Sequence, residues 1–313
     1  MPAQVLSSNN GGMKASKKHI VCAGTSGFIG TALLKELEDN GWSTTILTRS
    51  QPEADNEVAW FPDSYQLDSQ VLADADAVIC LNGAPLMRWP WTDSYKQELV
   101  NSRLKSVKTI ADAINSLPKE SRPRTFISGS AVGYYGSREN EILTEDSAPS
   151  NDFLGGLCQV WEKQARTAKV DRVIHVRTGL VLEDGGGMLQ AMKPLFKMFA
   201  GGRLGDGRQW MPTISLRDHV RAIRFLLESD ELSGAFNLTG PQPVANEEFT
   251  AAVAEYFDRP VGPTAPAFGI RMLLGDMAVV ALSSQYVVPQ RLEEAGFEFL
   301  DYTITEQIES TRS

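Results

Sequence analysis

The sequence predicts an α/β fold with helices on both faces of a doubly wound parallel sheet. Short apolar runs alternate with helical stretches between residues 18 and 180, an order typical of a parallel sheet with crossover helices. The first apolar run ends at a glycine-rich turn that leads into a helix. The chain has 313 residues, of which 42% are hydrophobic, so it can bury the core that such a sheet requires.

The elements of this sheet can be assigned in chain order. A helix follows the first strand and ends at Gly41, and longer helices are expected over Thr92–Ser116 and Cys158–Lys169. The strands are short and rich in apolar or β-branched residues, and they are expected at His19–Ala23, Ser43–Thr48, Ala77–Leu81, Thr125–Ser128 and Val173–Val176.

The sequence changes character after Thr178. Glycine-rich loops at 185–187 and 201–207 flank an amphipathic stretch, and a proline-rich piece at 260–266 has the composition of a linker. Further elements are expected at Met188–Phe199, Asp218–Ser229, Ala235–Leu238, Asn246–Phe257 with Asn246 as its N-cap, Ile270–Leu282 and Pro289–Ala295.

These features predict three regions. Residues 1–17 are expected to form a disordered tail, because they are rich in Ser, Asn, Gly and Lys. Residues 18–180 are expected to form the sheet domain, with sheet contributions from about 210–240. Residues 181–313 are expected to form a smaller C-terminal α/β lobe that binds the substrate.

Charge and composition restrict the classes of partner. A net charge of −9 repels nucleic-acid backbones and anionic lipid, so we expect neither nucleic acid nor membrane as a partner. Three cysteines outside any C-x-x-C pair and three scattered histidines indicate a reducing, cytoplasmic setting and no metal site. A monomer or homodimer that acts on a small molecule fits this composition.

The glycine-rich turn has the sequence of a dinucleotide-binding loop. Glycines allow a tight turn and let backbone N–H groups approach a pyrophosphate, and the helix N-terminus adds partial positive charge. A strand precedes the turn and a helix follows it, which is the context that this motif needs. The expected cofactor contacts are Gly24, Thr25, Ser26, Gly27, Phe28, Ile29 and Gly30.

The end of the second strand bears on the choice of dinucleotide. An NAD site usually places an acidic residue here to bind the ribose 2′-OH, and this chain has none before Glu53. Arg49 instead offers a guanidinium to a 2′-phosphate, which favours NADP(H). The alternative is a solvated arginine in a loop.

A serine and two tyrosines follow the fourth strand. Ligands of open α/β sheets bind at the carboxyl ends of strands, so Ser130 is expected to point into the crevice and to hydrogen-bond a substrate oxygen. The alternative is a turn serine. Tyr134 or Tyr135 can pack on the nicotinamide or the substrate, although buried aromatic packing is the simpler interpretation.

Several motifs together resemble those of a known family. Over residues 18–311 the chain is similar to extended short-chain dehydrogenase/reductases, and more narrowly to NAD(P)-dependent epimerase-like proteins with an extra C-terminal domain of unknown function, here about 260–311. Relatives are often labelled sugar-nucleotide epimerases, and some cell-division inhibitors. The resemblance rests on Gly24–Gly30, Ser102-Arg103, Ser128–Gly136, Trp161-Glu162, Arg177–Gly179, Gly205–Gln209 and Pro289–Phe299.

The resemblance implies an NADP-binding Rossmann domain with a small substrate lobe. It assigns Ser130 as the superfamily's catalytic serine, and it implies that Arg208 binds an anionic group of the substrate. Beyond the glycine turn and Arg49, it implies cofactor contacts at Cys80 and Gly83 on the adenosine side, at Arg103, and at Arg177 and Thr178 near the nicotinamide.

One departure from the superfamily affects the chemistry. The proton-transfer tyrosine and its lysine partner fall at Leu154 and Cys158 in this chain. Neither side chain supplies the phenol and cation that the reaction uses. Cys158 can be a reactive thiol or, more simply, a buried structural cysteine. Asp218 stands at the start of the helix expected over Asp218–Ser229, and the simplest interpretation is that it caps this helix.

Three functions remain open on the sequence. The first is an NADP(H)-dependent oxidoreductase in which Ser130 polarises a carbonyl and Tyr134, Tyr135 or a water replaces the missing tyrosine. The second is a non-catalytic NADP(H)-binding redox sensor or partner-binding protein, with a link to cell division in this class. The third is a sugar-nucleotide epimerase with an unrecognised base. The first is favoured.

Overall fold

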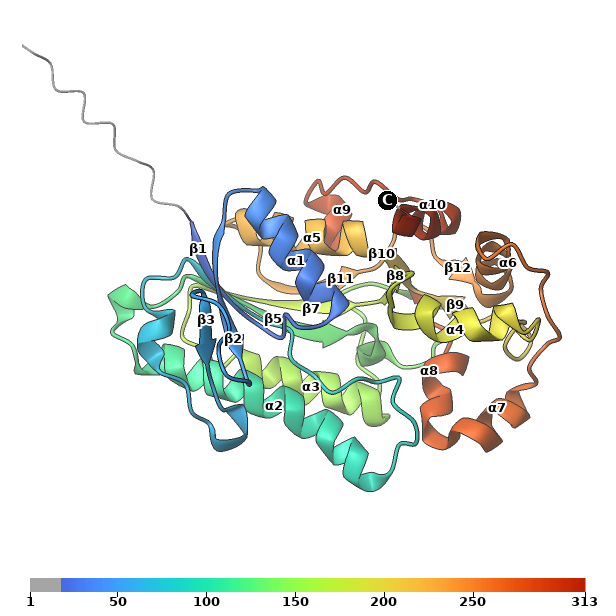
Figure 1. Ribbon diagram of the computed structural model, residues 1–313, viewed down its shortest axis with the longest axis horizontal. Coiled ribbons are helices and arrows are strands. Elements are labelled where there is room, and N and C mark those ends of the chain that lie inside the picture. Colours follow the sequence, from blue (N-terminus) through green and yellow to red (C-terminus); the bar gives the residue numbers. More distant parts are fainter. Residues whose placement is uncertain (1–17, 313) are drawn as a thin grey trace, which may run out of the picture.

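The computed structural model describes residues 18–312, and its centre is a seven-stranded sheet in which every pairing is parallel (Figure 1). The predicted tail at residues 1–17 lies outside this range. The strand order is β11 (Gly234–Leu238), β7 (Arg172–Thr178), β5 (Thr125–Ala131), β4 (Ala77–Cys80), β1 (His19–Ala23), β2 (Ser43–Thr48) and β3 (Glu57–Ala59). The order reverses between β1 and β4, where open α/β sheets bind ligands. The predicted fold class is confirmed.

Two hydrophobic clusters cover the two faces of the sheet. Helices α1 (Phe28–Asp39) and α5 (Leu216–Glu228) lie on one face, and α2 (Asp93–Ser116) and α3 (Phe153–Ala165) lie on the other (Figure 1). Alternate residues of β1 supply the two clusters, because successive side chains of a strand point to opposite faces. Both faces are therefore apolar, which explains why the strands read as continuous hydrophobic runs.

A smaller lobe lies beside the carboxyl end of the sheet, at the right of Figure 1, around a separate cluster that includes Phe249. No helix within residues 18–312 is long and apolar enough to cross a membrane. The short paired strands of this half are β8 (Leu180–Glu183) with β10 (Thr213–Ser215), β9 (Trp210–Met211) with β12 (Val244–Ala245), and β6 (Ile142–Leu143) with β13 (Tyr286–Val287). The helices are α4 (Gly187–Lys197), α6 (Asn246–Tyr256), α7 (Ala267–Leu274), α8 (Ala278–Leu282), α9 (Gln290–Glu294) and α10 (Ile304–Glu309).

Three details of the predicted helices are wrong. Helix α3 begins at Phe153 rather than Cys158, because the Asp152 carboxylate accepts a hydrogen bond from the Gly155 N–H at 2.8 Å and caps the helix earlier. The predicted helix 270–282 is broken at Gly275, which has a φ of +56°. Asn246 does not cap α6, because its buried side chain accepts from the Leu204 N–H and donates to a methionine sulfur.

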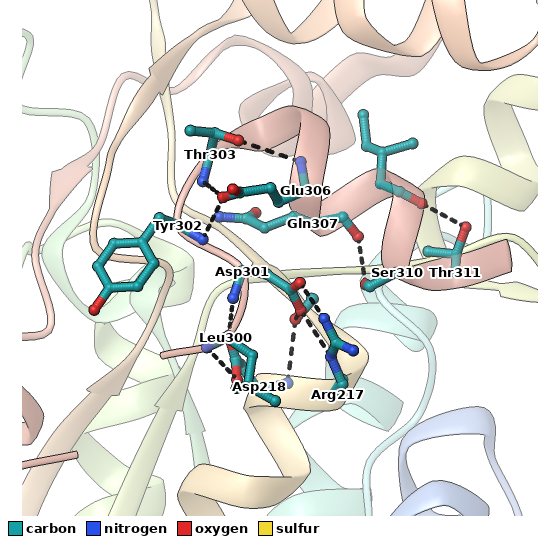
Figure 2. A network of polar contacts seen from close by, with 12 residues as sticks. Arg217, Asp218, Leu300, Asp301, Tyr302, Thr303, Glu306, Gln307, Ser310 and Thr311 are labelled. Atoms are coloured by element: carbon teal, nitrogen blue, oxygen red, sulfur yellow. Dashed lines mark hydrogen bonds and ion pairs between the residues drawn. The ribbon is translucent and has the colours of Figure 1, made fainter. Parts of the chain in front are cut away.

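A buried carboxylate network attaches the C-terminal segment to the rest of the chain (Figure 2). The Asp301 carboxylate accepts hydrogen bonds from the Ser215 hydroxyl at 2.6 Å and from the Arg217 guanidinium. Asp218 accepts the backbone N–H groups of Leu300 and Asp301, both at 2.9 Å. Asp218 therefore does not cap α5. Ser215 does so, by accepting the Asp218 N–H at 3.1 Å.

Replacing Asp301 by alanine is expected to lower the free energy of unfolding by about 2 kcal/mol, because the buried Ser215 hydroxyl and the partly exposed Arg217 guanidinium both lose their acceptor. The control is Asp276→Ala, which removes an exposed ion pair with Lys96 and should cost less than about 1 kcal/mol. Urea unfolding followed by tryptophan fluorescence measures both. Equal losses for the two variants would contradict the role given to Asp301.

Candidate functional site

The glycine turn after β1 packs too closely for any side chain at two of its three glycines. Gly24 has a φ of +83°, and a Cβ placed on it would lie 2.5 Å from the Asn82 nitrogen. A Cβ on Gly30 would lie 2.3 Å from the Thr25 Cα. These contacts bring the start of α1 close to the ends of β1 and β4, the point where the strand order reverses.

Gly27 differs from these two glycines because the space beside it is open. No heavy atom lies within 4 Å of a Cβ built on Gly27, and both Gly27 and Ser26 are exposed. Gly27 is the N-cap of α1, and no side chain caps this helix end. Its first N–H groups are therefore available to an anion, and the helix dipole favours negative charge there.

Arg49 extends from the end of β2 on the same edge of the sheet. Its side chain is exposed, and its guanidinium makes no hydrogen bond or ion pair with the rest of residues 18–312. It lines a cavity of about 300 Å³ between the ends of the strands and helix α2. A guanidinium that is unpaired and lies beside a cavity can bind a phosphate through two parallel hydrogen bonds.

Two hydrogen bonds hold the loop that follows β4 against α2. The Ala84 N–H donates to the Ser102 hydroxyl at 2.9 Å, and Arg103 donates to the Ala84 carbonyl at 3.1 Å. Gly83 lies against the Arg103 guanidinium, which a Cβ on Gly83 would approach to 2.9 Å. The Cys80 side chain is fully buried in the core. The geometry gives Arg103 a supporting role beneath the loop rather than an exposed one.

Ser130 at the end of β5 takes part in a buried ion-pair network. Its hydroxyl donates to the Glu162 carboxylate at 2.8 Å, and Arg177 from β7 donates to the same carboxylate at 2.9 and 3.2 Å. Burial alone would raise the pKa of Glu162, but the hydrogen bonds and charge of Arg177 outweigh it and lower the pKa. Glu162 is therefore ionised, and its carboxylate accepts the only hydrogen bond that the Ser130 hydroxyl can donate.

The two tyrosines after Ser130 have different environments. Tyr135 is fully buried; its hydroxyl donates to the Asn237 side chain at 2.6 Å and accepts from Arg177 at 2.9 Å. Burial raises the pKa of Tyr135, so it stays protonated. Tyr134 is half-buried, and the Arg177 guanidinium lies 3.6 Å from the centre of its ring. Within residues 18–312 the Tyr134 hydroxyl makes no hydrogen bond.

The side chains at the usual tyrosine and lysine positions are structural. Leu154 packs in the apolar cluster of Trp91 and Met277. Cys158 is buried, its thiol donates to the Ala131 carbonyl at 3.6 Å, and burial raises the pKa of the thiol to about 12. A thiol that stays protonated is a poor nucleophile, so Cys158 is a structural cysteine.

Two further candidates lie toward the smaller lobe. Thr178 at the end of β7 is half-buried, and its hydroxyl shares a 3.0 Å hydrogen bond with the His219 imidazole. Burial lowers the pKa of His219 to about 3, so this imidazole is neutral. Arg208 is exposed, and its guanidinium is unpaired within residues 18–312. In that same range no group of three or more His, Cys, Asp or Glu side chains is placed to hold a metal ion.

Sequence reasoning did not assign roles to three buried residues that organise this edge. Glu162 bonds Ser130 and Arg177, and Asn237 bonds Tyr135. Glu145 is buried, accepts the Asn237 N–H at 3.0 Å, and offers its own carbonyl to Arg177. Trp161-Glu162 is one of the motifs on which the family resemblance rests. A charged residue inside an otherwise apolar helix was the feature of the sequence that could have pointed to Glu162.

Comparisons with known proteins agree with this architecture. Residues 20–154 match the NAD dependent epimerase/dehydratase family, and residues 265–310 match a domain of unknown function (DUF1731). An epimerase family protein of Mycobacterium leprae is 40% identical over 94% of this chain and 96% of its own length. A chloroplastic homolog of epimerase family protein SDR39U1 from Arabidopsis thaliana is 36% identical over 91% of this chain and 84% of its own.

Solved structures show the same fold. Human epimerase family protein SDR39U1, determined with NADPH, has a TM-score of 0.86 at 26% identity and covers 94% of this chain and 99% of its own. A nucleoside-diphosphate sugar epimerase from Corynebacterium glutamicum has a TM-score of 0.76 at 30% identity, over 94% of this chain and 57% of its own. The chain therefore belongs to the NAD-dependent epimerase/dehydratase family, among the epimerase family proteins that carry the additional C-terminal domain.

Proposed function

We propose that this chain binds NADP(H) along the carboxyl edge of the sheet and works as an oxidoreductase on a small molecule. Two features together carry the proposal. The helix N-terminus at Gly27 is uncapped and has open space beside it, and Arg49, at the end of the neighbouring strand, has an unpaired guanidinium within residues 18–312. The human family member solved with NADPH supports the same ligand.

The residues at this edge fit an NADP(H) dinucleotide. The N-terminus of α1 is free to receive the pyrophosphate, because no side chain caps it and nothing fills the space beside Gly27. Thr48-Arg49-Ser50 offers a cation and two hydroxyls where an NAD site usually has an acid for the ribose 2′-OH. A 2′-phosphate satisfies Arg49, whereas a 2′-OH leaves it without a charged partner.

Nicotinamide supplies or accepts a hydride when it is bound, so the chain itself must orient the substrate and move one proton. Of the three candidate hydroxyls, Ser130 and Tyr135 already donate their protons to Glu162 and Asn237. We assign proton transfer to Tyr134, whose hydroxyl has no protein partner within residues 18–312. Arg177, fixed from below by Glu162, holds the Tyr134 ring in place.

Arg208 supplies the contact expected for an anionic substrate. It is exposed on the loop between α4 and β9 of the smaller lobe, and its guanidinium is unpaired within residues 18–312. A phosphate or carboxylate on the substrate would meet this charge. The Corynebacterium relative, named a nucleoside-diphosphate sugar epimerase, makes a sugar nucleotide one substrate class to test.

A second candidate function is that of an NADP(H)-binding protein without catalysis. The observation in its favour is the pair Leu154 and Cys158, which fill the usual tyrosine and lysine positions with a partly buried leucine and a buried cysteine. Such a protein would use cofactor binding to change its affinity for a partner, as a redox sensor does. Identical partner pull-downs with and without NADPH would remove this alternative.

Replacing Arg49 by alanine is expected to weaken NADPH binding about 10- to 100-fold and to change NADH binding less than about twofold, because only the 2′-phosphate loses its partner. Isothermal titration calorimetry measures both affinities. The matched control is Arg124→Ala. Arg124 is an exposed arginine just before β5, at the amino ends of the strands and away from the proposed site. A parallel loss of NADPH and NADH affinity in Arg49→Ala would contradict the role of Arg49.

Replacing Tyr134 by phenylalanine is expected to lower kcat about 100-fold with little change in NADPH affinity, because the ring packing stays and the transferable proton is lost. The assay is NADPH oxidation with a panel of aldehydes, ketones, quinones and oxidised sugar nucleotides. Tyr135→Phe, the control, should lose stability through its buried hydrogen bonds. A wild-type protein that binds NADPH and turns over none of the panel would favour the non-catalytic alternative.

A further inference from the structure

We propose that Lys105 is a second cationic ligand for the 2′-phosphate of the dinucleotide, and that it exchanges its ion pair with Asp63 for that phosphate. This inference rests on the proposed NADP(H) function and adds a specificity-determining residue to it. Lys105 lies on α2, far from Arg49 in sequence, and no motif of the chain draws attention to it.

The cavity beside Arg49 joins these two cations. It has a volume of about 300 Å³, at the lower end of the range for small-molecule sites. Arg49 reaches it from the end of β2, Pro62 and Asp63 from the turn after β3, and Ser102 and Lys105 from α2. The second strand of such folds ends beside the adenosine ribose, so a 2′-phosphate bound by Arg49 would lie in or at the mouth of this cavity.

The contact between Lys105 and Asp63 can be exchanged. The Lys105 ammonium lies 3.0 Å from the Asp63 carboxylate, whose side chain is 86% exposed, whereas the lysine side chain is only 28% exposed. An exposed carboxylate is well solvated and binds a lysine weakly. A phosphate monoester carries close to two negative charges at neutral pH and three acceptor oxygens, so it competes effectively for the ammonium.

The charges around the cavity favour a two-cation arrangement. Arg49 alone neutralises about half of the phosphate charge, and Lys105 can neutralise the remainder. Glu98 also lines the cavity, and Arg88 lies 3.8 Å from its carboxylate and offsets its charge. Lys108, one turn further along α2, pairs with Asp112 at 2.6 Å and does not line the cavity.

The test uses 2′,5′-ADP and 5′-AMP, which differ only in the 2′-phosphate, titrated calorimetrically into the full chain. Lys105→Met is expected to weaken 2′,5′-ADP binding about 5- to 20-fold and to leave 5′-AMP binding within about twofold. Lys108→Met is the matched control and should change neither. Asp63→Asn should tighten 2′,5′-ADP binding about two- to fivefold, because Lys105 loses its competing partner.

The outcomes separate this inference from the function on which it rests. Unchanged 2′,5′-ADP binding in Lys105→Met, with a loss in Arg49→Ala, overturns the role of Lys105 and leaves the NADP(H) proposal intact. Equal losses for both nucleotides in Lys105→Met overturn it as well, because they indicate a role in shaping the cavity. A wild-type chain that binds 2′,5′-ADP no more tightly than 5′-AMP overturns the NADP(H) preference itself.

Discussion

The buried ion pair between Glu162 and Arg177 holds together the edge of the sheet on which the candidate site is built. It joins α3 to β7, fixes Ser130 at the end of β5, and places a guanidinium under Tyr134. Burying two charges is costly, and the pair is tolerated because Ser130, Tyr135 and the Glu145 carbonyl satisfy the remaining hydrogen bonds. Removing either partner would leave an uncompensated charge at the centre of the site.

This network also explains how the site can depart from the superfamily pattern. Leu154 and Cys158 are packed into the protein, so in the proposed reaction the proton-transfer group comes from another element. Glu162 accepts the Ser130 proton and Asn237 accepts the Tyr135 proton, whereas the hydroxyl of the half-buried Tyr134, whose ring lies against Arg177, has no partner within residues 18–312. The proposed cofactor side needs no such substitution, because the turn at Gly24–Gly30 would bind a dinucleotide through its backbone, and its shape depends on close packing of the first and third glycines.

Local patterns predicted the sheet and the glycine turn, because strand hydrophobicity and glycine spacing are properties of adjacent residues. The bounds of α3 and the break at Gly275 were missed, since a single capping aspartate and a single glycine decide them. The network of Glu162, Asn237 and Glu145 joins residues far apart in the chain, so only the fold brings it together. The same holds for Lys105, which meets Arg49 only across the cavity.

A crystal structure of the chain with NADPH tests the central claim most directly. The account predicts pyrophosphate oxygens within hydrogen-bonding distance of the backbone N–H groups beside Gly27, at the start of α1, and the 2′-phosphate against Arg49. A dinucleotide bound elsewhere, or a 2′-phosphate pointing into solvent away from Arg49, would contradict it.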